Sequence, residues 1–156
     1  MTLDEIVNGL SGIKGVIAAA VVDYGSGMMM ASHTNDSGFD LEAASAGCVN
    51  IIRAKMKTVA HLELDDELHD IQISLHNQIH LICPCTNKEN IFVYLVADRK
   101  VANLSICRRS LFSAEKLVEF YQRTMILEVE RLDEECDNIE QRQSRMDFYK
   151  RNGFKT

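Results

Sequence analysis

Two segments of the chain carry only apolar and aromatic residues, and they constrain the fold more than any other feature. They are Val16–Val22 and Ile91–Ala97. A strand that is apolar on both faces must be covered on both faces. We therefore expect the two segments to be central strands of one sheet, with helices packed on either side.

The rest of the chain shows helical or strand periodicity around these two segments. Thr2 and Glu5 have the spacing of a capping box, which predicts a helix ending near Ile13. Alternation and turn residues predict the other strands, and helical spacing predicts two more helices. These segments are the strands Met28–Thr34, Leu68–Leu75 and Gln78–Cys83, and the helices Phe39–Ala60 and Ala102 to about Arg151, the last with a break near Ser110–Ser113. The predicted order is helix, strand, strand, helix, three strands, helix, which is an α/β (α+β) fold.

Two of the predicted elements have surfaces that one domain alone does not satisfy. In Leu68–Leu75 the apolar residues alternate with polar ones, so we expect an edge strand with one wet face, and an exposed edge is a site for pairing. On Phe39–Ala60 the apolar arc spans roughly 160° at ~100° per residue, wider than the stripe of about 100° that a surface helix needs. The surplus width predicts contact with a second chain; the alternative is a helix buried more deeply in its own domain.

Composition excludes several classes of function. The 156 residues carry 17 Lys and Arg against 23 Asp and Glu, a net charge of −6, which disfavours a nucleic-acid binder. The longest apolar run is too short to cross a bilayer, and no signal peptide is evident at the N-terminus. The odd number of cysteines, five, favours reduced thiols, so we expect a cytoplasmic protein without membrane insertion.

No local pattern predicts an active site. Cys83-Pro84-Cys85 with His80 and His76 lacks the paired spacing of a zinc knuckle, so we interpret the thiols as structural and expect no metal, cofactor or catalytic residue. Ser26 lies between two glycines outside any nucleophile elbow, and the chain has no phosphate-binding loop of the P-loop type. Basic residues cluster at Arg99, Lys100, Arg108 and Arg109; they form either a solvated face or a contact for an anionic partner.

Two motifs at the expected separation resemble the roadblock/dynein light-chain family. Lys14-Gly15-Val16-Ile17-Ala18-Ala19-Ala20-Val21-Val22-Asp23, after the first helix, is similar to that family's "GV.GA.VVD" strand and turn. Leu95-Val96-Ala97-Asp98-Arg99-Lys100-Val101-Ala102-Asn103-Leu104 is similar to its last strand and to the "DR..ANL" start of its final helix. The resemblance covers roughly residues 1–116 and includes the order of elements between the motifs.

The resemblance implies a roadblock/profilin-like fold: a five-stranded mixed sheet between one helix and two. It also implies a homodimer, or a heterodimer with a paralogue, formed by pairing third strands and middle helices. Family members scaffold or regulate small Ras-like GTPases, and bacterial ones include a GTPase-activating partner in gliding motility. We therefore expect a non-catalytic regulator of such a GTPase. The dimer-interface candidates are Val49, Ile52, Met56, Asp70, Ile71, Gln72, Ile73 and Ser74, and the partner-binding candidates are Glu42, Ser45, Val49, Arg53 and Met56.

The chain departs from the family beyond Lys116. Met125, Val129, Leu132, Cys136, Ile139, Gln143 and Met146 follow the spacing of a short heptad seam. Acidic residues flank most of the seam and would repel in a parallel homodimer, so we expect this helix to pack on its own domain or on a different protein. The predicted division is a roadblock-like domain, 1–116, and a helical extension, 117–151.

Two other functions stay open from the residues. A sheet and helix of this size can enclose a small molecule, which gives a sensor or signalling domain without a GTPase partner. An enzyme that uses Cys83, Cys85 and His80 is the third possibility.

Overall fold

In a computed structural model of the protein, residues 1–86, 90–134, 147, 150 and 151 are described. The elements are α1 (Leu3–Ser11), β1 (Val16–Asp23), β2 (Met28–Thr34), α2 (Leu41–His61), β3 (Ile71–Ser74), β4 (Gln78–Pro84), β5 (Ile91–Asp98) and α3 (Leu104–Glu134). Their order is the predicted one. The capping box is also present: Thr2 Oγ1 accepts the Glu5 N–H at 3.2 Å, and a Glu5 carboxylate oxygen accepts the Thr2 N–H at 2.9 Å.

The five strands form one sheet in the order β2-β1-β5-β4-β3. Each neighbouring pair is antiparallel. The expectation of a mixed sheet is therefore wrong in this detail, because hairpins join β1 to β2, β3 to β4 and β4 to β5, and β1 pairs antiparallel with β5. Both segments predicted to be central are interior strands, and β5, in the middle, is buried along nearly its whole length.

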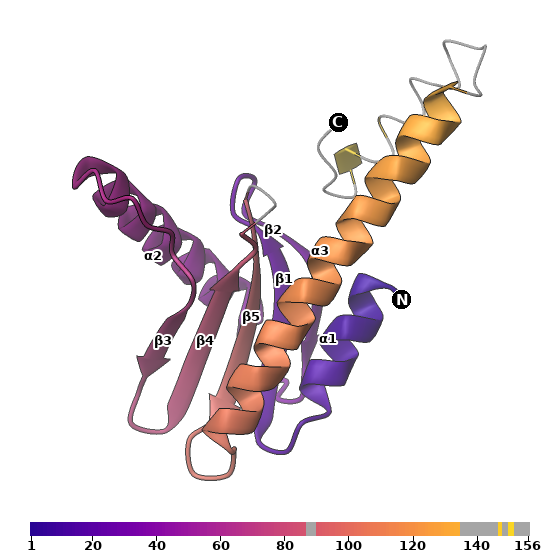
Figure 1. Ribbon diagram of the computed structural model, residues 1–156. Coiled ribbons are helices and arrows are strands. Elements are labelled where there is room, and N and C mark those ends of the chain that lie inside the picture. Colours follow the sequence, from indigo (N-terminus) through magenta and orange to yellow (C-terminus); the bar gives the residue numbers. More distant parts are fainter. Residues whose placement is uncertain (87–89, 135–146, 148–149, 152–156) are drawn as a thin grey trace.

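Helices cover both faces of the sheet, as the two apolar strands require (Figure 1). Side chains of β5 alternate between the two layers: Val93 and Leu95 pack toward α1 and α3, while Phe92, Tyr94 and Val96 pack toward α2. The protein therefore has two hydrophobic cores, one on each face of the sheet. In Figure 1 the far ends of α2 and α3 both extend past the same end of the sheet, α2 behind it and α3 in front of it.

Two predicted features differ from the structure. The third strand is Ile71–Ser74, shorter than the predicted Leu68–Leu75, because residues 62–70 form the connection from α2 to the sheet. The break expected near Ser110–Ser113 is absent. That segment contains neither Gly nor Pro, and the buried Leu111 holds it against the sheet.

The last helix continues past the predicted domain boundary. Helix α3 runs through Lys116 and Leu117 without interruption. The division into a domain, 1–116, and a helical extension, 117–151, therefore stays a prediction. Met125 and Val129 of the heptad seam are half-buried, and Cys136, Ile139, Gln143 and Met146 lie outside the described residues. Across the described part of the chain, no helix combines the length and apolar character that crossing a membrane requires.

Candidate interaction site on the edge strand and the second helix

Strand β3 forms one edge of the sheet and has a single strand neighbour, β4. In this pair Gln72 lies opposite Leu81 and Ile73 opposite His80. The outer side of β3 has no strand partner among the described residues, so its backbone donors and acceptors can pair with another chain. Ile71 and Ile73 are half-buried beneath α2, whereas Gln72 and Ser74 are exposed on the other face, which is the predicted alternation.

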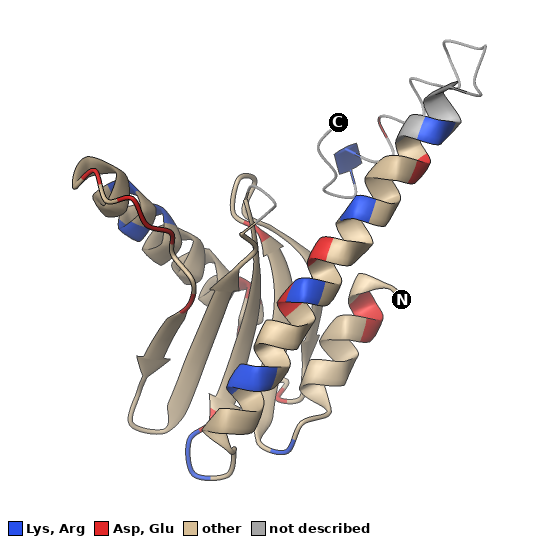
Figure 2. Cartoon of the chain, in the orientation of Figure 1, with Lys and Arg blue, Asp and Glu red and all other residues tan. Residues whose placement is uncertain are grey.

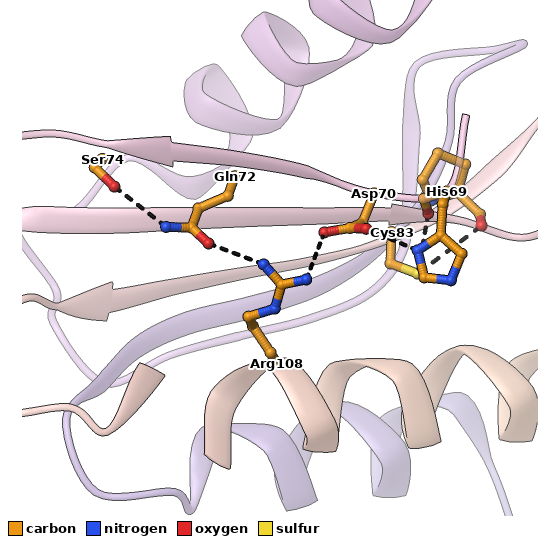
Figure 3. A network of polar contacts seen from close by, with 7 residues as sticks. His69, Asp70, Gln72, Ser74, Cys83 and Arg108 are labelled. Carbon is orange, nitrogen blue, oxygen red and sulfur yellow. Dashed lines mark hydrogen bonds and ion pairs between the residues drawn. The ribbon is translucent and has the colours of Figure 1, made fainter. Parts of the chain in front are cut away.

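An arginine from α3 holds the exposed face of this strand (Figure 3). Arg108 Nη1 donates to Gln72 Oε1 at 3.1 Å, and Arg108 Nη2 lies 3.4 Å from Asp70 Oδ2. The other Asp70 oxygen lies 2.7 Å from His69 Nδ1, and Gln72 Nε2 donates to Ser74 Oγ at 3.4 Å. The polar side chains predicted for the dimer interface thus already form a network that fixes β3 to its own domain.

Aromatic contacts complete this network. The guanidinium carbon of Arg108 lies 5.5 Å from the centroid of the Phe112 ring, a cation–π distance. The ring of His69 meets Phe112 edge-on, with centroids 5.1 Å apart. Of the predicted basic cluster, Arg108 therefore binds within its own chain. Arg99 also does, because its Nη1 donates to Leu75 O at 3.0 Å.

Helix α2 buries one side and leaves a flank of small and apolar residues bare. The buried side carries Leu41, Ser45, Cys48, Val49 and Ile52. On the bare flank, Ala43, Gly47, Ala54 and Thr58 are exposed, and Ile51 is 39% exposed. A Cβ on Gly47 would have no neighbour within 4 Å. Such a flank allows a second helix to approach closely, because small side chains shorten the distance between helix axes.

The bare flank points toward the edge of the sheet that β3 forms. Two contacts fix this orientation: Ser45 Oγ lies 3.6 Å from Met29 Sδ of β2, and Arg53 donates to the carbonyls of Tyr24 and Gly25 in the β1–β2 turn. These residues lie toward the β2 side of the sheet. At ~100° per residue, Gly47 and Ile51 lie on the opposite side of the helix. The bare flank therefore lies on the side of α2 away from β2, toward the β3 side of the sheet.

The predicted contact residues fall into four groups. Ser45, Val49 and Ile52 are buried in their own domain, so their side chains have little surface left for another chain. Met56 is half-buried, and Glu42 and Arg53 are exposed. Asp70, Gln72 and Ser74 belong to the Arg108 network, and Ile71 and Ile73 to the core under α2. If a second chain contacts α2, it meets mainly the residues of the bare flank, which were not among the predicted contact residues.

Sequence patterns missed the residues that form the bare flank: Gly47, Ile51 and Ala54. Ile51 lay within the wide apolar arc, and the small residues at positions 43, 47 and 54 share one helix face, which was an available signal. Arg108 was noticed only as part of a basic cluster. Its partner Gln72 is 36 residues away, and no local pattern indicates that pairing.

A chain of hydrogen bonds runs along the sheet face that α2 covers, from Tyr94 of β5 to His80 and Gln78 of β4. Tyr94 Oη lies 2.6 Å from His80 Nδ1, and His80 Nε2 lies 3.0 Å from Gln78 Oε1. Because the amide oxygen only accepts, Nε2 carries the proton and Nδ1 accepts from the tyrosine. Burial lowers the pKa of His80 and raises that of Tyr94, so both groups are neutral and serve packing.

The four described cysteines are free and buried. Burial is the main cause that raises the pKa of Cys48 to about 11 and that of Cys83 to about 12. It also raises the pKa of Cys85 and of Cys107. Thiols in this state are poor nucleophiles and poor metal ligands. Among the described residues no group of three or more His, Cys, Asp and Glu side chains is placed to hold a metal ion.

A five-stranded antiparallel sheet with one helix on one face and two on the other is the roadblock/LC7 fold, and solved structures with that fold match the chain. The roadblock/LC7 domain from Streptomyces avermitilis matches with a TM-score of 0.66 at 12% identity, over 78% of this chain and 98% of that one. MglB of Myxococcus xanthus matches with a TM-score of 0.61 at 11% identity, over 78% and 92%. The gliding protein MglB of Thermus thermophilus gives a TM-score of 0.61 at 14% identity, over 71% and 81%. Neither a family model nor a curated protein sequence matches the chain.

Proposed function

We propose that the chain is a non-catalytic, dimeric interaction module that scaffolds or regulates a small Ras-like GTPase. The observation that carries this proposal is the open edge of β3 beside the bare flank of α2, in a chain with the roadblock/LC7 fold. Both surfaces are unsatisfied in one chain and lie toward the same side of the sheet. A second copy can cover both at once.

The dimer we propose is isologous. Two β3 strands pair antiparallel across a two-fold axis and join the two sheets into one, while the two α2 helices pack against each other through Gly47, Ile51 and Ala54. Arg108 contributes indirectly, because it holds β3 in place before the partner arrives. An ordered edge loses less conformational entropy on pairing than a mobile one. Val49 and Ile52 support α2 from beneath.

The GTPase part of the proposal derives from the family resemblance of the two sequence motifs. The joined α2 helices would present Glu42, Arg53 and Met56 on the same side of the dimer. Arg53 is held by the β1–β2 turn, so its side chain is oriented before a partner binds. A cytosolic location fits the free thiols, which persist in a reducing compartment.

The test uses purified Ras-like GTPases of the source organism, loaded with GDP or with a non-hydrolysable GTP analogue. Calorimetry should detect one GTPase that binds the dimer with a preference for one nucleotide state. Arg53→Ala should weaken that binding and leave the dimer mass unchanged. Equal binding of both nucleotide states, or no binding by any GTPase to the intact dimer, would contradict the proposed regulation. A heterodimer would appear as preferential pairing with a paralogue.

A further inference from the structure

The outward side of α3 carries a basic and apolar surface that the domain does not use. We call it the α3 outer face: Arg109, Lys116, Leu117, Phe120, Arg123 and Leu127. All six residues are exposed, with Phe120 71% and Leu127 65% accessible. At ~100° per residue they share an arc of roughly 120°, opposite the buried Leu111 and Val118. Arg131 extends the face, and the exposed acidic residue Glu128 lies at its border.

This face is unusual in two respects. Large apolar side chains that gather on an exposed surface mark interaction sites. Its charge is positive, whereas the chain as a whole carries −6. In the proposed dimer α3 lies on the sheet face opposite α2, so the α2 contact leaves the α3 outer face uncovered.

A second unused surface has the opposite charge. The connection after α2 carries four carboxylates in five residues, Glu63, Asp65, Asp66 and Glu67 with Leu64 among them; we call this segment, residues 62–67, the acidic rim. Figure 2 shows it as a red run beside α2, whereas α3 carries both blue and red bands. No ion pair within the described residues engages these carboxylates. Leu62 and Leu64 are 59% and 52% exposed.

The acidic rim borders a groove. The groove has a volume of about 580 Å³ and lies between the second half of α2, the rim and the ends of β4 and the β1–β2 turn. Met56, Val59, Leu64 and Leu68 supply its apolar walls, and Asp66 and Glu67 lie at its margin. An apolar hollow with an acidic margin fits a helix that offers aromatic and leucine side chains between Lys and Arg.

We propose that the α3 outer face of one molecule docks on the acidic rim and groove of a second copy. Both surfaces have an apolar centre, and their charges are opposite, so they are complementary in both respects. One chain cannot join its own two surfaces, because α3 and α2 are packed on opposite faces of the sheet and the outer face of α3 points away from it. The contact is therefore between copies.

This contact is heterologous: each molecule offers its α3 to one neighbour and its rim to another. Such contacts produce a ring if the rotation closes and an open chain if it does not. Each molecule in the proposed β3–α2 dimer retains both surfaces, so dimers would link into larger assemblies. Because the charges are exposed, the linkage should weaken as salt screens them, over a Debye length of about 10 Å at 0.1 M ionic strength.

The test is a charge exchange on the full chain, measured by sedimentation velocity in low salt at rising concentration. Wild type should grow beyond its high-salt mass. Lys116→Glu with Arg123→Glu should abolish growth, and so should Asp65→Lys with Asp66→Lys, since each pair of substitutions cancels the net charge of its surface: the α3 outer face keeps Arg109 and Arg131, and the rim keeps Glu63 and Glu67. A matched control, Lys14→Glu with Lys100→Glu, makes the same charge change on exposed residues elsewhere and should grow as wild type does.

Mixing the two charge-reversed variants distinguishes this contact from any other. In the mixture, the native α3 outer face of the rim variant meets the native rim of the α3 variant, so growth should return. Growth by the rim variant alone would assign α3 a different partner surface and overturn the proposal, as would wild type that shows no growth in low salt. The high-salt mass tests the β3–α2 dimer separately, so failure of one contact is distinguishable from failure of the other.

Discussion

At the scale of single residues, Arg108 links the last helix to the edge strand. It touches Gln72, Asp70 and Phe112, and its side chain is 40% accessible. Hydrogen bonds to charged groups contribute more to stability than exposed ion pairs do. The position of β3, and therefore the open edge, depends on this residue.

Replacing Arg108 tests that dependence. Arg108→Met should lower the free energy of unfolding by about 1–2 kcal/mol, measured by urea denaturation in high salt. Amides of β3 should also exchange with solvent faster. Arg109→Met, its neighbour on the outer face, is the control and should change the unfolding free energy by less than about 0.5 kcal/mol. Equal effects of the two substitutions would show that the network around Asp70 does not hold the strand.

Glu115 gives a second prediction, about pH. Burial, followed by the hydrogen bond and the charge of Glu119, raises the pKa of Glu115 from its ordinary 4.5 to about 7. Between these values the folded protein binds more protons than the unfolded chain, so the stability from this group is lost as pH rises. Glu115→Gln removes the titrating group and should flatten the fall in unfolding free energy between pH 5 and pH 7. Glu128→Gln, an exposed control, should keep the slope of wild type; the idea fails if both variants keep it.

At the scale of elements, the structure shows which predictions local patterns could support. The capping box and the two strands that are apolar on both faces were predictable because short-range chemistry and burial decide them. The length of β3 was not, because residues 68–70 alternate like a strand but belong to the connection from α2. The bare flank of α2 was not predictable either, because its position depends on how that helix packs on the sheet. Ser45 and Arg53 fix this packing through contacts with residues distant in sequence.

A substitution at Gly47 on α2 should affect the stability of the monomer and the formation of the dimer in opposite directions. Gly47→Leu adds a side chain where the single chain has open space. It also removes a helix-interior glycine, so the monomer should gain about 0.5–1 kcal/mol. The same side chain would collide with a close-packed second α2, so the dimer should dissociate to monomers in high salt. Ala46→Leu, on the other exposed side of the helix, should leave the dimer intact, and a Gly47→Leu variant that still dimerises would exclude the bare flank from the interface.

At the scale of the whole molecule, the two helical layers present different contact surfaces. The bare flank of α2 and the edge of β3 offer a surface of small and uncharged residues, suited to a close isologous contact. The α3 layer offers a basic and apolar face, suited to an acidic groove. The sheet keeps these surfaces on opposite sides, so one chain can make two kinds of contact at the same time. The sequence predicted the two layers but neither the pairing of charges across copies nor the network that holds the edge.

Light scattering in high salt with reductant tests the central claim, the β3–α2 dimer, most directly. At low micromolar protein we predict a mass of twice the 17.6 kDa chain, and a mass of one chain for Gly47→Leu under the same conditions. High salt suppresses the charged contact of α3, so it leaves the apolar contact to decide the result. A wild-type mass of 17.6 kDa that stays constant as concentration rises would contradict the account. The open edge of β3 would then await a different chain.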